Sequence, residues 1–355
     1  MKRFLIVKTS ALGDIIHAFP VVSYLRHHYP DAQIDWVVEA PFADLVRAHP
    51  QVNRVLCVST KVWRRSFWKA ATLKEVRAFV QQLRQVHYNA AFDLQGNIKS
   101  GLILSRVSSD VKVGFARSNV PEWPNLLFTT CKVAIPQSDN VREDYLQLVA
   151  RFIGNPLEDS KQSLTLRTTP QQQETVEKWL AHPALQSGRK IMVCPGSAWK
   201  NKQMTPEALA RFLQLLAENE KCAFLFMWGS SEEKQVAEAL QKKFPDTACV
   251  VDRIPLPAMH ALMQRCDLVI AMDSLPLHLA GTTQTPTFAL FGPSSAKKYN
   301  PPGPTHGFYQ GSCPYGRTFV KRCPVLRTCP TGACLRNPIG DAVFATFLAW
   351  QHSSQ

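Results

Sequence analysis

Short apolar runs alternate with segments of helical periodicity along most of this chain. The first half has strand-like runs at 4–7, 34–38, 55–58, 90–94 and 111–114, and helical patterns near 14–28, 42–48, 72–86, 97–106 and 140–153. The second half has strand-like runs at 190–194, 223–228, 248–251, 268–272 and 287–291, and helical patterns near 206–219, 232–244, 257–265 and 275–282. This alternation predicts βαβ units and mostly parallel sheets, which is an α/β fold.

The length of the chain favours two such domains. A single core seldom grows beyond about 250–300 residues, and this chain has 355. A polar interval from Asn155 to Thr169 separates the halves. We therefore expect Rossmann-like domains at 1–165 and 170–335 that face each other across a cleft. We expect residues 336–355 to form a helix that packs back toward the first domain.

The overall charge indicates an anionic partner. The chain has 41 Lys and Arg residues against 27 Asp and Glu residues, a net charge of +14. Phosphate, nucleic acid and an anionic membrane face all fit this charge. No apolar stretch reaches the roughly 18 residues of a spanning helix, and the N-terminus lacks a signal-peptide pattern. We therefore expect a cytoplasmic protein that at most rests on a membrane surface.

A basic and aromatic stretch runs from residue 61 to residue 84. It holds seven basic side chains and one acidic side chain, Glu75, with Trp63, Phe67 and Trp68 between them. This composition suits an interface with anionic lipid headgroups. Nucleic-acid binding would use the same composition, and a solvated helix face with an aromatic inner side is the structural alternative.

Residues 8–14 form a polar turn between the first strand-like run and the first helix. In an open α/β sheet, ligands bind at this edge. The turn offers backbone N–H groups, the hydroxyls of Thr9 and Ser10, and the carboxylate of Asp14. Asp14 alone has two interpretations, a helix N-cap or a catalytic group at the mouth of a cleft.

Three strand ends in the second half also carry polar side chains. These are Lys200 and Lys202 after the run at 190–194, Glu232 and Glu233 after 223–228, and Asp273, Ser274 and His278 after 268–272. Lysines there could neutralise a phosphate, an acidic residue could bind a ribose, and the N–H groups behind Ser274 could hold a diphosphate. The structural alternatives are solvated loops, helix-dipole pairing and capped helices. The chain has no G-x-G-x-x-G fingerprint and no G-x-x-x-x-G-K-[ST] loop, which disfavours a dehydrogenase and a P-loop NTPase. It also has no D-x-D pair to hold a metal ion.

Four cysteines, Cys313, Cys323, Cys329 and Cys334, lie in a Pro- and Gly-rich tail that begins at Gly292. Their spacing matches none of the tight C-x₂-C zinc templates. Ordinary reduced thiols and a zinc site both remain possible interpretations.

The chain carries six strings in one order. They are K-T-S-A-L-G-D-I-I-H-A-F-P (8–20), D-W-V-V-E (35–39), D-L-Q-G-N-I-K-S (93–100), the P-G-S…K loop that begins at 195, W-G-S-S-E-E (228–233) and M-D-S-L-P-L-H-L (272–279). Together they resemble the bacterial ADP-heptose:lipopolysaccharide heptosyltransferases of glycosyltransferase family nine, most closely the heptosyltransferase I branch. The resemblance covers nearly the whole chain.

This resemblance implies a GT-B fold and an inverting, metal-independent transfer without a cofactor. The implied donor is ADP-L-glycero-β-D-manno-heptose, and the implied acceptor is the Kdo inner core of lipid A. It implies that the enzyme acts at the cytoplasmic face of the inner membrane, where the basic 61–84 stretch binds anionic lipid. It implies no nucleic-acid partner. A transferase of the same scaffold that uses another sugar nucleotide or anionic glycolipid is the alternative. A non-catalytic nucleic-acid-binding protein would explain the charge but not three polar strand ends.

The resemblance also assigns roles to residues. Asp14 matches the proposed catalytic base. The expected donor-binding residues are Ser197, Lys202, Glu233, Asp273, Ser274 and His278. The expected acceptor-binding residues are Ser10, Lys61, Arg64, Arg65, Lys99 and Arg117. Three positions depart from the family pattern, namely Leu275 for a glycine, Pro121 for an arginine and Asn140 for a histidine.

Overall fold

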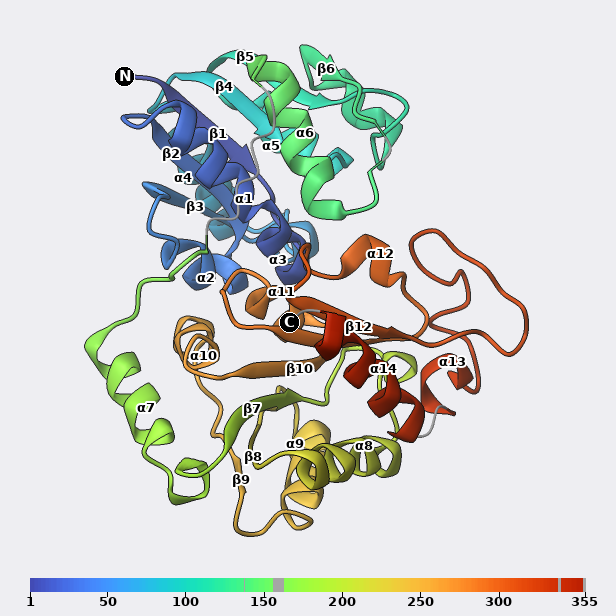
Figure 1. Ribbon diagram of the computed structural model, residues 1–355. Coiled ribbons are helices and arrows are strands. Elements are labelled where there is room, and N and C mark those ends of the chain that lie inside the picture. Colours follow the sequence, from blue (N-terminus) through green and yellow to red (C-terminus); the bar gives the residue numbers. More distant parts are fainter. Residues whose placement is uncertain (137, 156–162, 338–339, 354–355) are drawn as a thin grey trace. The chain divides into compact units, whose positions relative to one another are not determined.

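The computed structural model describes residues 1–136, 138–155, 163–337 and 340–353 (Figure 1). The chain divides into two compact units, Met1–Gln162 and Ser163–Gln355. The division lies within the polar interval between residues 155 and 169. Each unit has its own sheet and its own core.

The first unit is built on a six-stranded parallel sheet with the order β3-β2-β1-β4-β5-β6. Its strands are β1 (Arg3–Val7), β2 (Gln33–Glu39), β3 (Arg54–Val58), β4 (Tyr88–Asp93), β5 (Ser109–Phe115) and β6 (Cys131–Val133). Its helices are α1 (Leu12–His28), α2 (Ala43–Arg47), α3 (Thr60–Arg65), α4 (Ala70–Arg84), α5 (Ile98–Ser105) and α6 (Val141–Ile153), with short 3₁₀ turns η1 (Ala40–Phe42) and η2 (Trp123–Leu127). The strand order reverses between β1 and β4, which is where a doubly wound sheet binds ligands.

The second unit repeats this topology with the order β12-β11-β10-β7-β8-β9. Its strands are β7 (Arg189–Cys194), β8 (Cys222–Phe226), β9 (Ala248–Val250), β10 (Leu268–Met272), β11 (Thr287–Phe291) and β12 (His306–Gln310). Its helices are α7 (Pro170–Leu180), α8 (Pro206–Asn219), α9 (Ser231–Gln241), α10 (Leu256–Met263), α11 (Leu275–Ala280), α12 (Ala296–Tyr299), α13 (Ala333–Arg336) and α14 (Gly340–Ser353), with 3₁₀ turns η3 (Pro183–Leu185) and η4 (Lys200–Lys202). Here the order reverses between β7 and β10, so both units share the Rossmann arrangement.

The central strands confirm the predicted apolar runs. Every residue of β8, β10 and β11 is buried, because helices cover both faces of a parallel sheet. The ten predicted strands are all present, and the helix predicted at 206–219 has the bounds of α8. None of the helices in the described part of the chain is both long and apolar enough to cross a bilayer.

Several short elements were not predicted, among them α3, β6 and β12. The helix α3 has no buried residue and no side-chain cap. The edge strands β6 and β12 are only partly buried, and β12 lies in the tail that we expected to be irregular. Elements of this length and exposure lack the apolar periodicity on which the prediction depends.

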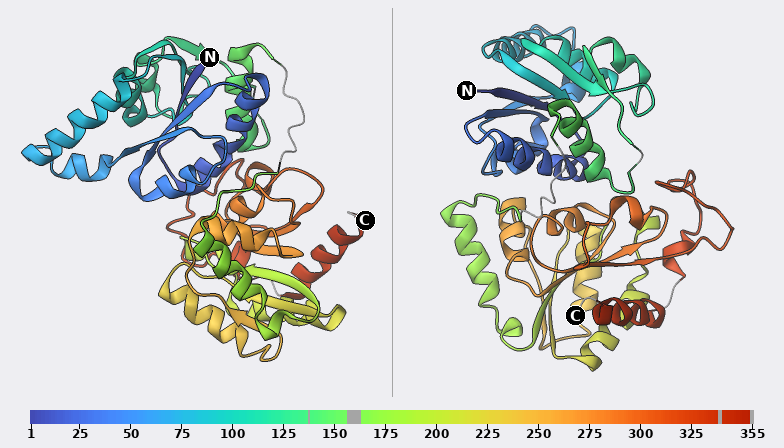
Figure 2. Two further views of the ribbon diagram at one scale, coloured as in Figure 1. Left: turned by 90° about the vertical axis from the view of Figure 1, so that its left-hand side faces the viewer. Right: turned by 45° about the horizontal axis from the view of Figure 1, so that its top comes forward.

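The last helix, α14, packs within the second unit against α8 and β12 (Figure 2). The Phe347 ring lies 6.0 Å from the Phe212 ring and 5.1 Å from the Phe288 ring. Trp350 covers Gly307 so closely that a Cβ there would lie 2.3 Å from the indole. These aromatic side chains complete the core of the second unit over β11 and β12.

Candidate active site

The polar cluster of the second unit is centred on Asp273, which follows β10 directly. The Lys202 Nζ atom, at the end of η4, lies 2.5 Å from Asp273 Oδ2. The Ser294 hydroxyl, in the loop after β11, donates to the same oxygen. The side chains of all three residues are buried. The ends of β7, β10 and β11 therefore bring an ammonium, a carboxylate and a hydroxyl together, as parallel strands predict.

His278, on α11, completes the contacts of this carboxylate. Its Nε2 atom lies 3.4 Å from Asp273 Oδ1. Burial by itself would raise the pKa of the Asp273 carboxyl. The hydrogen bond from His278 and the charge of Lys202 outweigh this effect and hold the pKa below its usual value of 3.8. The carboxylate is therefore ionised at neutral pH and keeps Lys202 in place.

Two serines expected in this cluster lie beside it. The Ser197 hydroxyl, after β7, donates to the Asp273 carbonyl at 3.3 Å. This bond joins β7 to β10 at the reversal of strand order. Ser274 occupies the N-cap position of α11, but its side chain makes no cap and donates instead to the Met272 carbonyl at 3.2 Å.

Glu233 lies at the next strand end along the sheet, in the first turn of α9. Its Oε2 atom accepts a hydrogen bond from the Gly229 N–H at 2.7 Å. Its carboxylate also packs on Gly196 in the turn after β7, where a Cβ would lie 2.1 Å from Glu233 Cδ. Glu232 is exposed and lies close enough to Lys200 for their charges to interact. Of the two acids, Glu233 is the one whose carboxylate packs on the turn after β7.

Asp14 in the first unit lies at the third position of α1, so it is not the N-cap. Ala11 occupies the cap, and the Ala11 N–H donates to Asp14 Oδ2 at 3.2 Å. The side chain thus supports the helix start through one oxygen. Burial lowers the pKa of Lys8 below its usual value, and the negative charges of Asp14 and Asp93 offset only part of this effect.

Two backbone N–H groups of the turn after β1 are bound by a side chain of the same unit. Gln95 Oε1 accepts from the N–H groups of Thr9 and Ser10, each at 3.2 Å. The buried Asp93 carboxylate holds this second turn, since it accepts from the Gln95 N–H at 2.9 Å. Of the N–H groups that we expected this turn to offer, those of Thr9 and Ser10 are therefore held by the Gln95 amide, which reaches across from β4 to β1.

Lys99, at the start of α5, pairs with a residue that we did not predict. Its Nζ atom lies 3.1 Å from Oε1 of Glu39, the last residue of β2. The other Glu39 oxygen accepts from the Thr60 N–H at 3.1 Å, at the start of α3. Glu39 therefore joins the starts of α3 and α5 at the carboxyl edge of the first sheet.

The remaining expected acceptor residues are exposed side chains of the first unit, namely Lys61, Arg64 and Arg65 on α3 and Arg117 after β5. The aromatic residues of this region fall into two groups, one packed and one exposed. Trp63 packs on Phe79 at 5.6 Å between ring centroids, whereas Phe67 and Trp68 are each 66% exposed. The stretch from residue 61 therefore has an aromatic inner side and, in addition, two aromatic rings in solvent.

Two of the unusual positions have local structural roles. Asn140 is the N-cap of α6 and accepts from the Arg142 N–H at 3.0 Å. Pro121 packs on Gly96, which has a φ of +68° and where a Cβ would lie 2.6 Å from the proline ring. These contacts give both residues a structural reason to be present.

Ser294, Glu39 and Gln95 are the site residues that sequence reasoning missed. Ser294 follows the predicted strand at 287–291, so the strand-end argument could have found it. Glu39 ends β2 and Gln95 follows β4, but polar side chains are common at strand ends, so neither position indicated a partner.

Comparisons with known proteins identify the family of this chain. The sequence profile of glycosyltransferase family 9 (heptosyltransferase) matches residues 76–327. The chain belongs to this family. Lipopolysaccharide heptosyltransferase 1 of Pseudomonas aeruginosa is 29% identical over 327 residues, which are 92% of this chain and 87% of that protein. The Salmonella typhimurium protein of the same name is 28% identical over 292 residues, 82% of this chain and 89% of that protein.

Solved structures have the same fold. E. coli heptosyltransferase WaaC with ADP has a TM-score of 0.79 at 23% identity, and covers 98% of this chain and 99% of its own. WaaC with ADP-2-deoxy-2-fluoro heptose has a TM-score of 0.72 at 25% identity, over 87% of this chain and 93% of its own. The two Rossmann-like units of this family 9 glycosyltransferase are thus of the GT-B type, as expected.

Proposed function

We propose that this family 9 enzyme transfers heptose from ADP-L-glycero-β-D-manno-heptose to the Kdo inner core of lipopolysaccharide, with inversion at the anomeric carbon. The observation that carries the proposal is the buried cluster of Lys202, Asp273, His278 and Ser294 at the strand reversal of the second sheet. The relatives named lipopolysaccharide heptosyltransferase 1 and the WaaC complexes with ADP and an ADP-heptose analogue support this choice of donor.

The second unit holds the donor in this proposal. Lys202 supplies positive charge to the diphosphate, and the N–H groups in the first turn of α11 behind Ser274 supply hydrogen-bond donors. Ser197 and Ser294 donate their hydroxyl protons to Asp273 and so hold this cluster in place. Glu233 accepts hydrogen bonds from the ribose hydroxyls, as an acidic residue does in other Rossmann sites. The cationic side chain takes the role that a metal ion has in enzymes with a D-x-D pair.

The reaction is a single displacement. Asp14 takes the proton from an acceptor hydroxyl while that oxygen bonds to the anomeric carbon, and the bond from this carbon to the diphosphate oxygen breaks. The electron pair leaves with ADP, whose new charge Lys202 stabilises. One Asp14 oxygen is held by the Ala11 N–H, which fixes the carboxylate so that the other oxygen can accept the proton.

The first unit holds the acceptor. Ser10, Lys61, Arg64, Arg65, Lys99 and Arg117 are the candidate contacts to its carboxylate and phosphate groups. Lys99 is oriented by its ion pair with Glu39. Basic side chains of this kind suit a polyanionic glycolipid.

Product formation tests the donor. Mass spectrometry after incubation with a Kdo-lipid A acceptor should detect addition of one heptosyl group from ADP-heptose and no transfer from UDP- or GDP-sugars. ADP at about 100 times its Kd should stabilise the native state by roughly 2.7 kcal/mol, which a thermal-shift assay detects as a higher Tm. Transfer from a UDP- or GDP-sugar, with none from ADP-heptose, would instead identify the alternative transferase.

The basic stretch supports a further part of the proposal, attachment to the anionic cytoplasmic face of the inner membrane. Phe67 and Trp68 are adjacent exposed rings, 5.1 Å apart, that follow the basic helix α3. Aromatic rings at this position can enter the headgroup layer while Lys and Arg side chains bind anionic headgroups.

Vesicle binding tests this attachment. Phe67→Ala/Trp68→Ala should weaken binding to vesicles that contain anionic lipid by about tenfold or more, because two rings no longer leave water. Added salt should weaken binding of both proteins. Phe308→Ala, which changes an exposed ring on β12, is the control and should bind normally. Equal binding of the double variant, or tighter binding to duplex DNA than to these vesicles, would contradict the proposal.

A further inference from the structure

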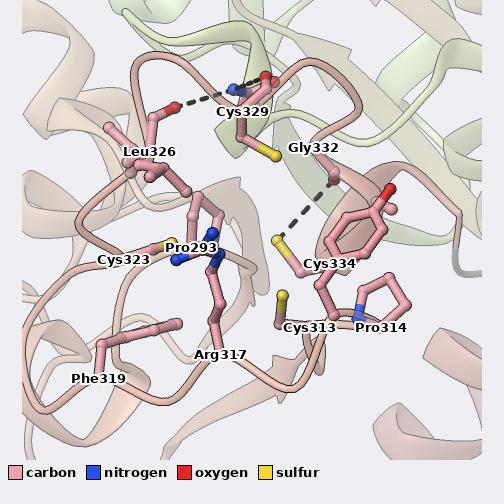
Figure 3. Close-up of a pocket in the computed structure, with 14 residues that line it drawn as sticks. Pro293, Cys313, Pro314, Arg317, Phe319, Cys323, Leu326, Cys329, Gly332 and Cys334 are labelled. Atoms are coloured by element: carbon pink, nitrogen blue, oxygen red, sulfur yellow. Dashed lines mark hydrogen bonds between the residues drawn. The ribbon is translucent and has the colours of Figure 1, made fainter.

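Four cysteines of the second unit line one cavity of about 30 Å³. They are Cys313, Cys323, Cys329 and Cys334, and Figure 3 shows the sulfur atoms of Cys313, Cys329 and Cys334 directed toward the same space. Pro293, Phe319 and Leu326 form apolar parts of the wall. None of the chain's ten cysteines forms a disulfide bond. The cavity has room for one ion or one or two water molecules.

The turn from Cys329 to Cys334 places polar groups around the Cys329 sulfur. The Thr331 hydroxyl lies 3.8 Å from this sulfur, within hydrogen-bond distance for a sulfur atom. Gly332 has a φ of +59°, which folds the turn back on this sulfur. Hydrogen bonds from surrounding groups orient metal ligands and tune the metal in protein sites.

The segment that carries these thiols has little regular structure to stabilise it. Between Gly311 and Asn337, the described chain forms a single four-residue helix, α13. Irregular segments with small cores commonly depend on a metal ion or a disulfide for their fold. Four thiols around one cavity, without a disulfide, match the ligand set of a zinc or iron ion.

The thiols are not gathered into coordination geometry. In the described residues, no group of three or more His, Cys, Asp or Glu side chains is arranged to hold a metal ion. Rotation of a cysteine side chain between staggered rotamers moves its sulfur by about 3 Å. Side-chain rotations alone can therefore bring the sulfur atoms closer together around a cavity of this size. The backbone that surrounds the cavity does not have to move.

The thiol segment also supports both loops of the donor cluster. The Asn201 side chain, next to Lys202, donates to the Leu326 carbonyl at 2.8 Å and to the Cys329 carbonyl at 2.9 Å. The Cys323 N–H donates to the Pro293 carbonyl at 2.8 Å. Pro293 precedes Ser294, whose hydroxyl binds Asp273.

We propose that Cys313, Cys323, Cys329 and Cys334 form a structural tetrathiolate site for one soft divalent cation, Zn²⁺ or Fe²⁺. The four thiols lose their protons on binding and no electron is transferred. The ion fixes the segment that supports Asn201 and Pro293, and thereby holds Lys202 and Ser294 against Asp273. Its effect on ADP rests on the proposed function, whereas metal binding does not.

Metal content is the first test. The full chain, purified without added metal, should contain about one ion per molecule by elemental analysis, which also distinguishes zinc from iron. Cys313→Ser/Cys334→Ser should lower this to under about 0.1 ion. Cys131→Ser, a partly exposed thiol of the first unit, is the matched control and should keep its ion. Less than about 0.1 ion in the unaltered protein, with the four thiols alkylated or disulfide-bonded in mass spectrometry, would overturn the site.

Reloading the unaltered protein separates metal binding from misfolding of the variant. Removal of the ion by a chelator under reducing conditions should lower the Tm and weaken ADP binding about tenfold, and Zn²⁺ or Fe²⁺ should restore both. Co²⁺ should give a thiolate-to-cobalt charge-transfer absorption that the double variant lacks. Restored metal without any change in ADP affinity would overturn the link to Lys202. Absence of ADP binding in the loaded protein would contradict the donor proposal and leave the metal site standing.

Discussion

Asp14→Asn is expected to lower the turnover number by about 10²- to 10⁴-fold and to leave the affinity for ADP nearly unchanged. An amide cannot take the proton from the acceptor hydroxyl. Its oxygen can still accept the Ala11 N–H, so the start of α1 should be preserved. The loss should therefore appear in the turnover number rather than in folding or donor binding.

Single-turnover kinetics and a direct ADP-binding measurement check this expectation. Asp44→Asn is a matched control, because Asp44 lies in the first turn of α2 in the same unit and is largely exposed. It should retain normal turnover. Normal turnover in Asp14→Asn would rule out the role of this residue as the base, whereas loss of folding in both variants would point to a general need for acids at these helix starts.

Lys202→Met is expected to lower the free energy of unfolding by about 3–5 kcal/mol and to abolish measurable ADP binding. The methionine cannot neutralise Asp273, which would remain as a buried carboxylate with His278 and Ser294 as its neighbours. Removal of one partner of a buried ion pair costs far more than the pair contributes, because the other charge stays out of water. Asp273→Asn in the same chain should recover part of the stability.

The loss of stability in Lys202→Met should decrease as the pH is lowered. The folded-state pKa of Asp273 lies below its usual value of 3.8. The stability that this carboxylate contributes is therefore present above pH 3.8 and is lost as the pH falls through the folded-state value. The difference between Lys202→Met and the unaltered protein, measured by urea denaturation, should be largest near neutral pH and should shrink in acid.

An exposed lysine provides the control for that experiment. Lys234, on α9, forms an ion pair with Glu238 in which both side chains are about half exposed. Lys234→Met should change the free energy of unfolding by less than about 1 kcal/mol, both near neutral pH and in acid. An equal loss in both lysine variants would show that the burial of Lys202 has no energetic consequence.

The sequence predicted the central strands well because they are covered on both faces. A strand such as β10 has no solvent-facing residue, so it reads as a continuous apolar run. The edge strand β12 alternates, contains Gly307 and depends on Trp350 of α14 for its cover. The side chain that covers β12 comes from a distant part of the sequence, so the local sequence pattern of β12 does not indicate its burial.

The same contrast applies to the candidate site. Parallel strands end at one edge, so polar residues after β7 and β10 were expected to meet, and Lys202 and Asp273 do. Ser294 follows a predicted strand, so the same argument extends to it, but its bond to Asp273 depends on the conformation of the loop after β11. Gln95 lies in the turn after β4, and neither its position nor its residue type indicates that its side chain binds the N–H groups of Thr9 and Ser10.

The position of α14 also has a consequence for the order of folding during synthesis. The first unit ends before residue 163, so its sheet can be complete while the ribosome is still translating the second. The second unit needs Phe347 and Trp350 over Phe288 and Gly307. Its core therefore cannot close until residue 350 has emerged, and throughout that interval β11 and β12 expose apolar surface that chaperones could bind.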